Sequence, residues 1–292
     1  MRCLFAILLL CACNPKGVPS DKSADTASSE VIESTTGTDG TEGGSSSGSD
    51  TNDESSTDSG SSTGDDVDPI IVSARLDVTE VRLITTPTAT ASHQFKFFVT
   101  FDDGSTRRLT SGVEWILNDA HIGEIGANGL FVTSSSEGGQ ANVVGRYGSN
   151  NAMAELTVRY EGESIPDGFD VSVFDAPETT WEGSGMIYPT DGTMIPKNQP
   201  SIHFQWEDMG ASAYRLKFES EVTELTIYST SLDWISDDEM WPVIGRSNAG
   251  LDVTSTLSAR IGDQVVVRDS QTMTIQDLEA TGSIIYWTPT AQ

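Results

Sequence analysis

The sequence predicts an all-β protein, with two β-sandwiches in tandem after a signal peptide and a disordered linker. From about Pro69 onward, β-branched and aromatic residues recur in short runs that alternate with polar residues. Turn residues separate these runs about every 8–12 residues, the spacing of a sandwich. The length of 292 residues suits two domains with an unfolded remainder.

Charge and composition exclude several classes of function. Lys and Arg number 16 against 44 Asp and Glu, a formal charge of −28, so phosphates would repel the chain and we expect no nucleic-acid partner. All three cysteines lie at positions 3, 11 and 13, which leaves no disulfide framework or thiolate metal site downstream. The histidines, His93, His121 and His203, show no metal-ligand spacing. We expect no cofactor, no metal site and no catalytic residue.

The N-terminus is typical of an export signal. Arg2 precedes the apolar run Leu4–Leu10, which is too short to span a bilayer. The run ends in Leu10-Cys11-Ala12-Cys13, which resembles the bacterial lipobox. That resemblance implies a signal peptide over residues 1–12, cleavage after Ala12 and a lipid-modified Cys13 as the link to a bilayer. Asn14 favours the outer membrane of a bacterial envelope; the alternative is an ordinary signal peptide that is cut elsewhere.

A linker is expected over residues 13–68. From Asn14 to Asp68, Ser, Thr and Gly supply 30 of 55 residues, 13 are acidic and none is aromatic. Such a segment cannot bury enough apolar surface to offset its conformational entropy. A spacer function fits this composition. Calcium binding by the Ser/Asp tract is the alternative, although a calcium site needs carboxylates fixed around one centre.

The first β-sandwich is expected over residues 69–161. Phe95, Phe97, Val99 and Phe101 alternate along one strand face, and Asp102–Ser105 supplies a hairpin turn with Gly104 at positive φ. The further expected strands are Val113–Trp115 with Trp115 in the core, Leu130–Val132 after the turn Asn128-Gly129, and a final hairpin of Asn142–Tyr147 and Ala154–Tyr160 around Gly148–Asn151.

Five segments of residues 69–161 resemble the group 2 bacterial Ig-like domain. They are Phe101–Thr106, Leu109-Thr110, Val113–Trp115, Ile122–Ile125 and Asn128–Phe131, in the family's order and spacing. Glu124 departs from the family pattern, which has a small residue there. The resemblance implies a spacer or adhesion module without a common catalytic residue. Asp102 and Asp103 could ligate calcium, but a solvated turn explains them better.

A second β domain is expected over residues 162–292, after a link over Glu161–Asp170. Its expected strands are Val171–Phe174, Ser201–Trp206, Ala213–Phe218, Glu224–Tyr228, Val253–Leu257, Gln264–Val267, Thr272–Ile275 and a last one near Gly282–Thr288. Ser236–Glu239 has the spacing of a capping box for one short helix at Met240-Trp241, limited by Pro242.

The run Tyr188–Pro200, followed by Phe204-Gln205-Trp206 and Tyr214–Leu216, resembles fibronectin type III-like domains of myxobacterial surface lipoproteins. Taken together, the two resemblances imply a bacterial surface lipoprotein that carries an Ig-like domain followed by a fibronectin type III-like domain.

Two classes of function follow. The first is a non-catalytic, membrane-anchored surface lipoprotein that displays Ig-like modules for adhesion, spacing or assembly. The second is an accessory carbohydrate-binding lipoprotein of a polysaccharide-processing system, whose ligand platform would use Trp181, Trp234 and Trp241, expected in loops or the short helix. A surface polysaccharide or a protein is the partner in either case. The carboxylates of Asp233 and Asp237–Glu239 could form a glycosidase pair, but charges at a helix start explain Asp237–Glu239 better.

Overall fold

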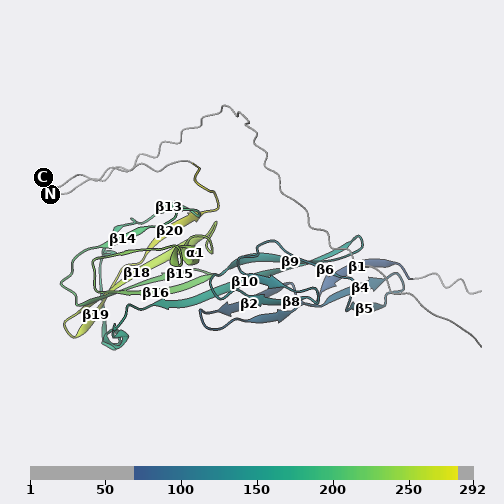
Figure 1. The fold of residues 1–292 in the computed structure, drawn as a ribbon, viewed down its shortest axis with the longest axis horizontal. Helices are drawn as coiled ribbons and strands as arrows, with labels where there is room; N and C mark the ends of the chain where they lie inside the picture. The colour runs from purple at the N-terminus through teal and green to yellow at the C-terminus, as the bar shows by residue number, and fades with distance from the viewer. Residues whose placement is uncertain (1–68, 282–292) are drawn as a thin grey trace, which may run out of the picture. The chain divides into compact units, whose positions relative to one another are not determined.

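The computed structural model describes residues 69–281, which belong to one compact unit (Figure 1). Within this range the regular secondary structure is almost entirely β-strand, arranged in packed sheets, which confirms the predicted tandem of β-sandwiches. The expected signal peptide, Cys13, the linker and the last strand near Gly282–Thr288 lie outside the described residues. In the part described, no helix has the length and hydropathy needed to cross a membrane.

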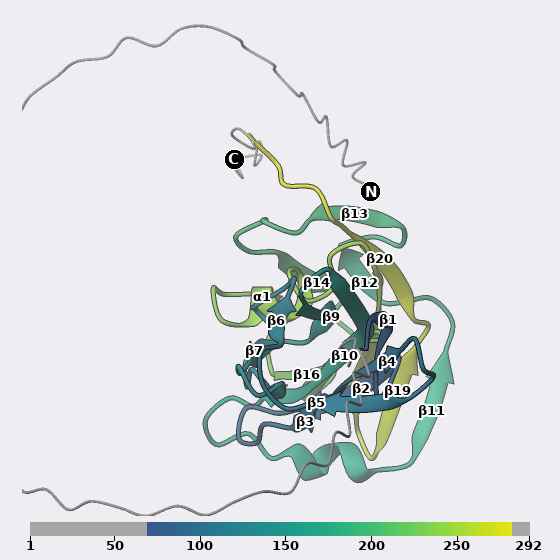
Figure 2. The same ribbon diagram turned by 90° about the vertical axis from the view of Figure 1, so that its right-hand side faces the viewer.

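The first sandwich has two layers around one core. One layer has the order β2-β10-β9-β6, and the other contains the sheets β1-β4-β5 and β3-β8-β7. Figure 2 views this sandwich from its end. Its strands are β1 (Ile71–Leu76), β2 (Glu80–Thr85), β3 (Ser92–Gln94), β4 (Phe97–Phe101), β5 (Thr106–Leu109), β6 (Glu114–Leu117), β7 (Gly123–Ile125), β8 (Leu130–Thr133), β9 (Gly139–Tyr147) and β10 (Asn150–Ser164).

The alternating run is buried as predicted: Phe95, Phe97, Val99 and Phe101 are each at most 6% exposed. It is not one strand, however. β3 pairs with β8 and β4 pairs with β1, so the chain changes sheets between them. Asp77 stabilises the change, because its carboxylate accepts the Lys96 N–H at 2.9 Å while its own N–H donates to the Lys96 carbonyl at 3.0 Å.

The predicted turns are confirmed where glycine is needed. Gly104 has φ +82° between β4 and β5, and Gly129 has φ +81° before β8. The hairpin of β9 and β10 also forms as expected, with Asn150 opposite Tyr147.

The second sandwich packs the sheet β12-β14-β17 against β16, β15 and β18, with β19, β20, β11 and β13 completing the larger layer. Its strands are β11 (Glu178–Trp181), β12 (Met186–Tyr188), β13 (Thr193–Pro196), β14 (His203–Trp206), β15 (Ala213–Glu219), β16 (Thr223–Ser229), β17 (Asp233–Ile235), β18 (Asp252–Ile261), β19 (Gln264–Arg268) and β20 (Gln271–Gln276).

One helical segment was predicted as a strand, and the other was predicted as a helix but with a different cap. Val171–Asp175 is a 3-10 helix (η1) rather than a strand, because the Asp170 carboxylate accepts the Ser172 N–H at its start. Helix α1 (Met240–Ile244) forms as expected, but without the capping box. Ser236 instead bonds to the Ile202 backbone, and the Asp237 carboxylate accepts the N–H groups of Glu239 and Met240.

One strand runs through the expected boundary between residues 161 and 162. β10 pairs with β9 and β2 through its first part and then, from Tyr160 to Ser164, pairs in parallel with Thr223–Ile227 of β16. The expected link over Glu161–Asp170 is therefore wrong for Glu161–Ser164, which is strand. A single 11-stranded sheet includes strands of both sandwiches.

Candidate functional site

Backbone hydrogen bonds join the two sandwiches at their junction. Tyr160 donates its N–H to the Val222 carbonyl at 3.0 Å, where β10 begins to pair with β16. Gly138 lies directly against this contact, since a Cβ on it would be 2.1 Å from the Val222 oxygen and 2.7 Å from the Val158 oxygen. Its own N–H donates to the Ser247 hydroxyl at 3.2 Å. The close approach requires glycine at this position.

An ion pair between a buried carboxylate and a solvent-exposed guanidinium lies beside that glycine. The Glu137 carboxylate, whose residue is only 7% exposed, accepts two hydrogen bonds from the Arg246 guanidinium, one of them from Nε at 2.6 Å. The paired carboxylate raises the pKa of Arg246. Bidentate geometry and the burial of the Glu137 carboxylate make this contact more specific than an ion pair between two fully exposed side chains.

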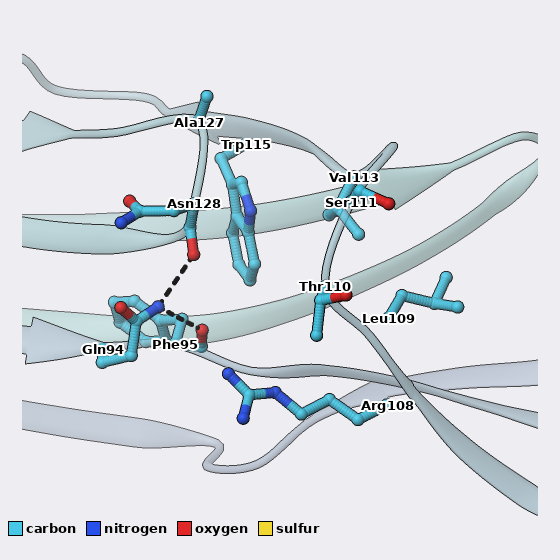
Figure 3. Close-up of a pocket in the computed structure, with 10 residues that line it drawn as sticks. All are labelled: Gln94, Phe95, Arg108, Leu109, Thr110, Ser111, Val113, Trp115, Ala127 and Asn128. Atoms are coloured by element: carbon cyan, nitrogen blue, oxygen red, sulfur yellow. Dashed lines mark hydrogen bonds between the residues drawn. The ribbon is translucent and has the colours of Figure 1, made fainter.

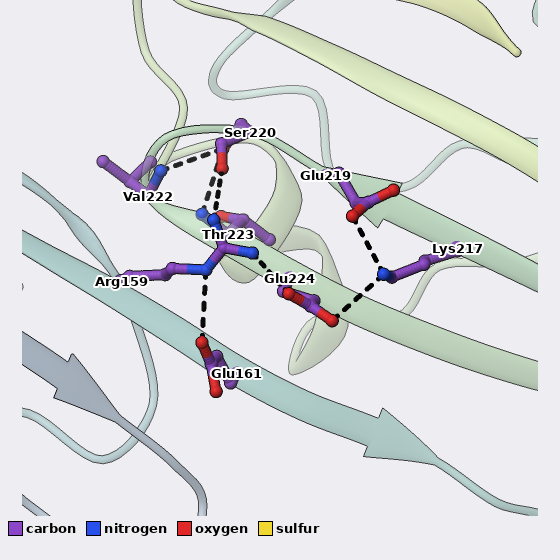
Figure 4. A network of polar contacts seen from close by, with 8 residues as sticks. All are labelled: Arg159, Glu161, Lys217, Glu219, Ser220, Val222, Thr223 and Glu224. Atoms are coloured by element: carbon purple, nitrogen blue, oxygen red, sulfur yellow. Dashed lines mark hydrogen bonds and ion pairs between the residues drawn. The ribbon is translucent and has the colours of Figure 1, made fainter.

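A second polar network covers the same junction (Figure 4). The Arg159 guanidinium of β10 pairs with Glu224 of β16 and, at 3.3 Å, with Glu161, and it donates to the Ser220 carbonyl at 3.1 Å. Lys217 lies 3.1 Å from Glu224. Hydrogen bonds from Lys217 and then Arg159 hold the pKa of Glu224 below its ordinary value. The network thus ties β10 to the second sandwich.

Behind this network, a buried amide joins α1 to β16. The Asn248 side chain donates to the Thr223 hydroxyl at 2.9 Å and to the Ile244 carbonyl at 2.9 Å. Thr223 in turn donates to the Val243 carbonyl at 3.1 Å. These bonds satisfy the end of a helix of only five residues.

The first sandwich carries a small pocket (Figure 3). Its volume is about 160 Å³, and it lies among the end of β5, the loop Thr110–Val113 and the turn at Asn128. The partly buried Trp115 supplies aromatic surface, with the buried Phe95 behind it, and Arg108 reaches toward them. Gln94 fixes one wall, because its amide donates to the carbonyls of Phe95 and Asn128 at 2.9 and 2.8 Å.

The three predicted platform tryptophans do not form one surface. Trp181 ends strand β11 and is 54% exposed, so its ring is accessible. Trp234 lies in β17 and packs against Phe204 and Phe218, with ring centroids 5.4 and 6.0 Å away. Trp241 is only 4% exposed within the core, so the expectation of an accessible platform is wrong for this residue.

Three of the carboxylates singled out in the sequence, Asp103, Asp233 and Asp237, contact groups of their own chain. Asp237 caps α1, as described above. Asp103 accepts the Ser105 N–H at 2.7 Å, and hydrogen bonds from the Ser105 hydroxyl and then from this N–H lower the pKa of Asp103. Asp233 lies 2.8 Å from Nε2 of His203 on the adjacent strand. Residues 69–281 contain no group of three or more His, Cys, Asp or Glu side chains placed to hold a metal ion.

Sequence reasoning assigned Trp115 to the core and did not consider Arg108. Trp115 does pack on the core, 6.2 Å from Phe95 and 6.5 Å from Phe97 between ring centroids, but it also lines the pocket. The sequence signal that could have pointed to Arg108 is the pair Arg107-Arg108, two adjacent cations in a strongly acidic chain.

No protein-family profile and no curated protein matches the chain. Among solved structures, it is similar to domains 4 and 5 of the S-layer protein SbsC, with 15% identity and a TM-score of 0.24 over 31% of this chain and 53% of that one. The match therefore spans about half of that structure.

It is also similar to the titin Ig tandem domains A164-A165, with 9% identity and a TM-score of 0.23 over 69% of this chain and 97% of that one. Domains 1–6 of SbsC share 11% identity with a TM-score of 0.26, over 73% of this chain and 27% of that one. TM-scores this low do not establish a shared fold, so the fold rests on the strand pairing described above.

Proposed function

We propose that the protein is a membrane-anchored envelope lipoprotein, which displays a joined pair of Ig-like sandwiches as a non-catalytic module for adhesion, spacing or assembly. The observation that carries this proposal is strand β10, which pairs with strands of both sandwiches. A shared strand, with the Glu137–Arg246 ion pair beside it, resists bending between the two parts, and a spacer needs that resistance. Inter-domain motion is otherwise the usual expectation for tandem domains.

Cys13 supplies the anchor in this proposal. The lipobox resemblance at Leu10–Cys13 supports it, and the Ser/Thr/Gly-rich, acidic composition of residues 14–68 suits a tether between lipid and sandwiches. A single acyl chain binds membranes only marginally, whereas two or more chains retain a protein stably. The proposal therefore requires the multiple acylation that the lipobox implies.

The decisive experiment replaces the acylated thiol. Cys13→Ser should abolish labelling by radioactive fatty acid and move the protein from the membrane fraction to the soluble fraction. Cys3→Ser is the matched control, since it removes a thiol from the signal peptide and should leave labelling and fractionation unchanged. A Cys13→Ser protein that remains labelled and membrane-bound would refute the anchor.

Accessory carbohydrate binding is the second candidate function, and the pocket at Trp115 favours it. Sugar rings stack on exposed aromatic faces, and a pocket with a few polar groups is the usual form of a small-ligand site. Binding of the full chain to a panel of immobilised oligosaccharides tests this function. Trp181→Ala distinguishes the pocket from the exposed tryptophan, because pocket binding should survive that substitution.

A further inference from the structure

Positive charge without a carboxylate partner gathers on one sheet of the first sandwich. Nine of the thirteen Lys and Arg residues in the described range lie within 4.0 Å of a carboxylate. The other four are Arg75, Arg107, Arg108 and Arg260. Three of these lie on β1 and β5, the two strands that flank β4. In a chain with a formal charge of −28, this grouping requires an explanation.

Strand register places two of these cations on the same face. Phe98 of β4 lies opposite Arg75 on one side and Arg108 on the other, so the three side chains form a row across the sheet. The Arg75 guanidinium lies 4.5 Å from the Phe98 ring centroid, and that of Arg107 lies 4.8 Å from the Phe101 ring. Arg75 and Arg107 are thus stabilised by cation–π contacts. Arg108 has no such contact in the described residues.

The Arg108 side chain is directed instead into the pocket (Figure 3). Beside it, the hydroxyls of Thr110 and Ser111 make no hydrogen bond within residues 69–281 and remain available to a ligand. The Asn128 carbonyl and side-chain oxygen accept hydrogen bonds from Gln94 and Leu130, and the Asn128 side chain points away from Trp115 and Arg108 (Figure 3). The pocket therefore combines hydrogen-bond donors, one unpaired guanidinium and the Trp115 ring.

This chemistry selects a particular ligand. A guanidinium recognises a carboxylate through two parallel hydrogen bonds, the neighbouring hydroxyls suit sugar hydroxyls, and an indole face suits the apolar face of a sugar ring. The volume of about 160 Å³ accommodates one ring rather than a folded chain. The formal charge of −28 repels anionic polymers at long range, so recognition of an anionic ligand would have to come from Arg108 at close range.

We propose that the pocket beside Arg108 binds a uronic acid residue of an acidic polysaccharide, with Arg108 as the partner of the ligand carboxylate and Trp115 as the stacking surface. The proposal rests on the carbohydrate-binding function above and narrows its ligand to acidic sugars. It is independent of the Cys13 anchor.

The test is calorimetric titration of the purified full chain with a galacturonic acid hexamer, with maltohexaose as the neutral comparison. We expect binding of the acidic hexamer, with maltohexaose at least about ten-fold weaker, as loss of one charge-assisted contact predicts. Arg108→Gln should weaken galacturonate binding about ten-fold, and Arg108→Lys should recover part of the loss. Arg146→Gln is the matched control, because it removes one exposed positive charge from β9 and should change affinity less than about two-fold.

Several outcomes would overturn the proposal. Equal affinity for the neutral and acidic hexamers would leave carbohydrate binding in place but remove the selectivity for acid. Absence of binding to both would remove the carbohydrate function as well. Binding to phosphatidylglycerol vesicles without binding to galacturonate would assign the unpaired arginines to a membrane contact. An equal effect of Arg108→Gln and Arg146→Gln would show general charge attraction in place of a site.

Discussion

Gly138→Ala should separate the two sandwiches. A Cβ at this position would lie 2.1 Å from the Val222 oxygen, 2.7 Å from the Val158 oxygen and 3.0 Å from the Tyr160 nitrogen. All three atoms belong to backbone, so no flexible side chain can move away to make room. The added methyl group must displace the start of β16 from β10, where Tyr160 donates its N–H to Val222.

The magnitude follows from the contacts that are lost. Overpacking of this kind costs about 1–3 kcal/mol, and an unsatisfied backbone pair adds about 1–3 kcal/mol. A central value of about 3 kcal/mol is a large part of the 5–15 kcal/mol typical of a folded protein. For a folded region of this size, the expected fall in Tm is about 6–12 °C.

Two measurements on the full chain check this expectation. Thermal unfolding gives Tm, and amide hydrogen exchange reports on Tyr160 and the start of β16. Gly168→Ala is the control, because no atom lies within 4 Å of its added Cβ and only its φ of +73° is unfavourable. It should cost about 1 kcal/mol and leave Tyr160 protected. Equal Tm values for the two variants, with Tyr160 equally protected in both, would refute a close-packed junction.

Three further perturbations test the charges and the cap. Arg246→Ala leaves the buried Glu137 carboxylate unpaired and should cost about 2–3 kcal/mol in urea unfolding, and a double variant with Glu137→Gln should cost less than the single change. The folded state lowers the pKa of Glu224 below its ordinary value of 4.5. The ionised Glu224 therefore stabilises the fold above pH 4.5, and this stabilisation is lost as the pH falls through the lowered pKa. In Glu224→Gln, the urea midpoint should depend less on pH in that acid range. Asp237→Ala should cost about 1 kcal/mol through the lost cap, and a 100-fold loss of any hydrolase activity without unfolding would contradict its structural role.

The cores were predictable because alternation along a strand is a local signal. Phe95, Phe97, Val99 and Phe101 are buried as their spacing indicates, and the turns at Gly104 and Gly129 follow from residue type. The continuation of β10 into the second sandwich was not predictable. Glu161–Ser164 pairs with β16 through its backbone, and its polar side chains with a glycine among them are typical of a link.

Two tryptophans also show that the local sequence does not predict long-range packing. Trp241 stands among acidic residues and next to Pro242, so its surroundings in sequence indicate exposure, yet long-range packing of α1 buries it. Trp115 lies on an apolar strand, which correctly predicts core contacts but not the pocket formed by the loop Thr110–Val113 and Asn128. Pockets depend on where separate loops meet, and strand periodicity carries no information about that.

The two proposed functions reinforce each other physically. A pocket with one guanidinium and one indole supplies few contacts, and binding must also offset the ordering of a sugar ring, so the affinity of one site is expected to be weak. An acidic polysaccharide repeats its carboxylates, and copies of a lipid-anchored protein share one membrane surface. The second binding event is then effectively intramolecular, and the overall affinity rises by about 10²–10⁴ without any new contact. A rigid junction increases this gain, because each sandwich pair loses less conformational freedom when it binds a shared polymer. Display and weak binding together therefore account for an adhesive module better than either does alone.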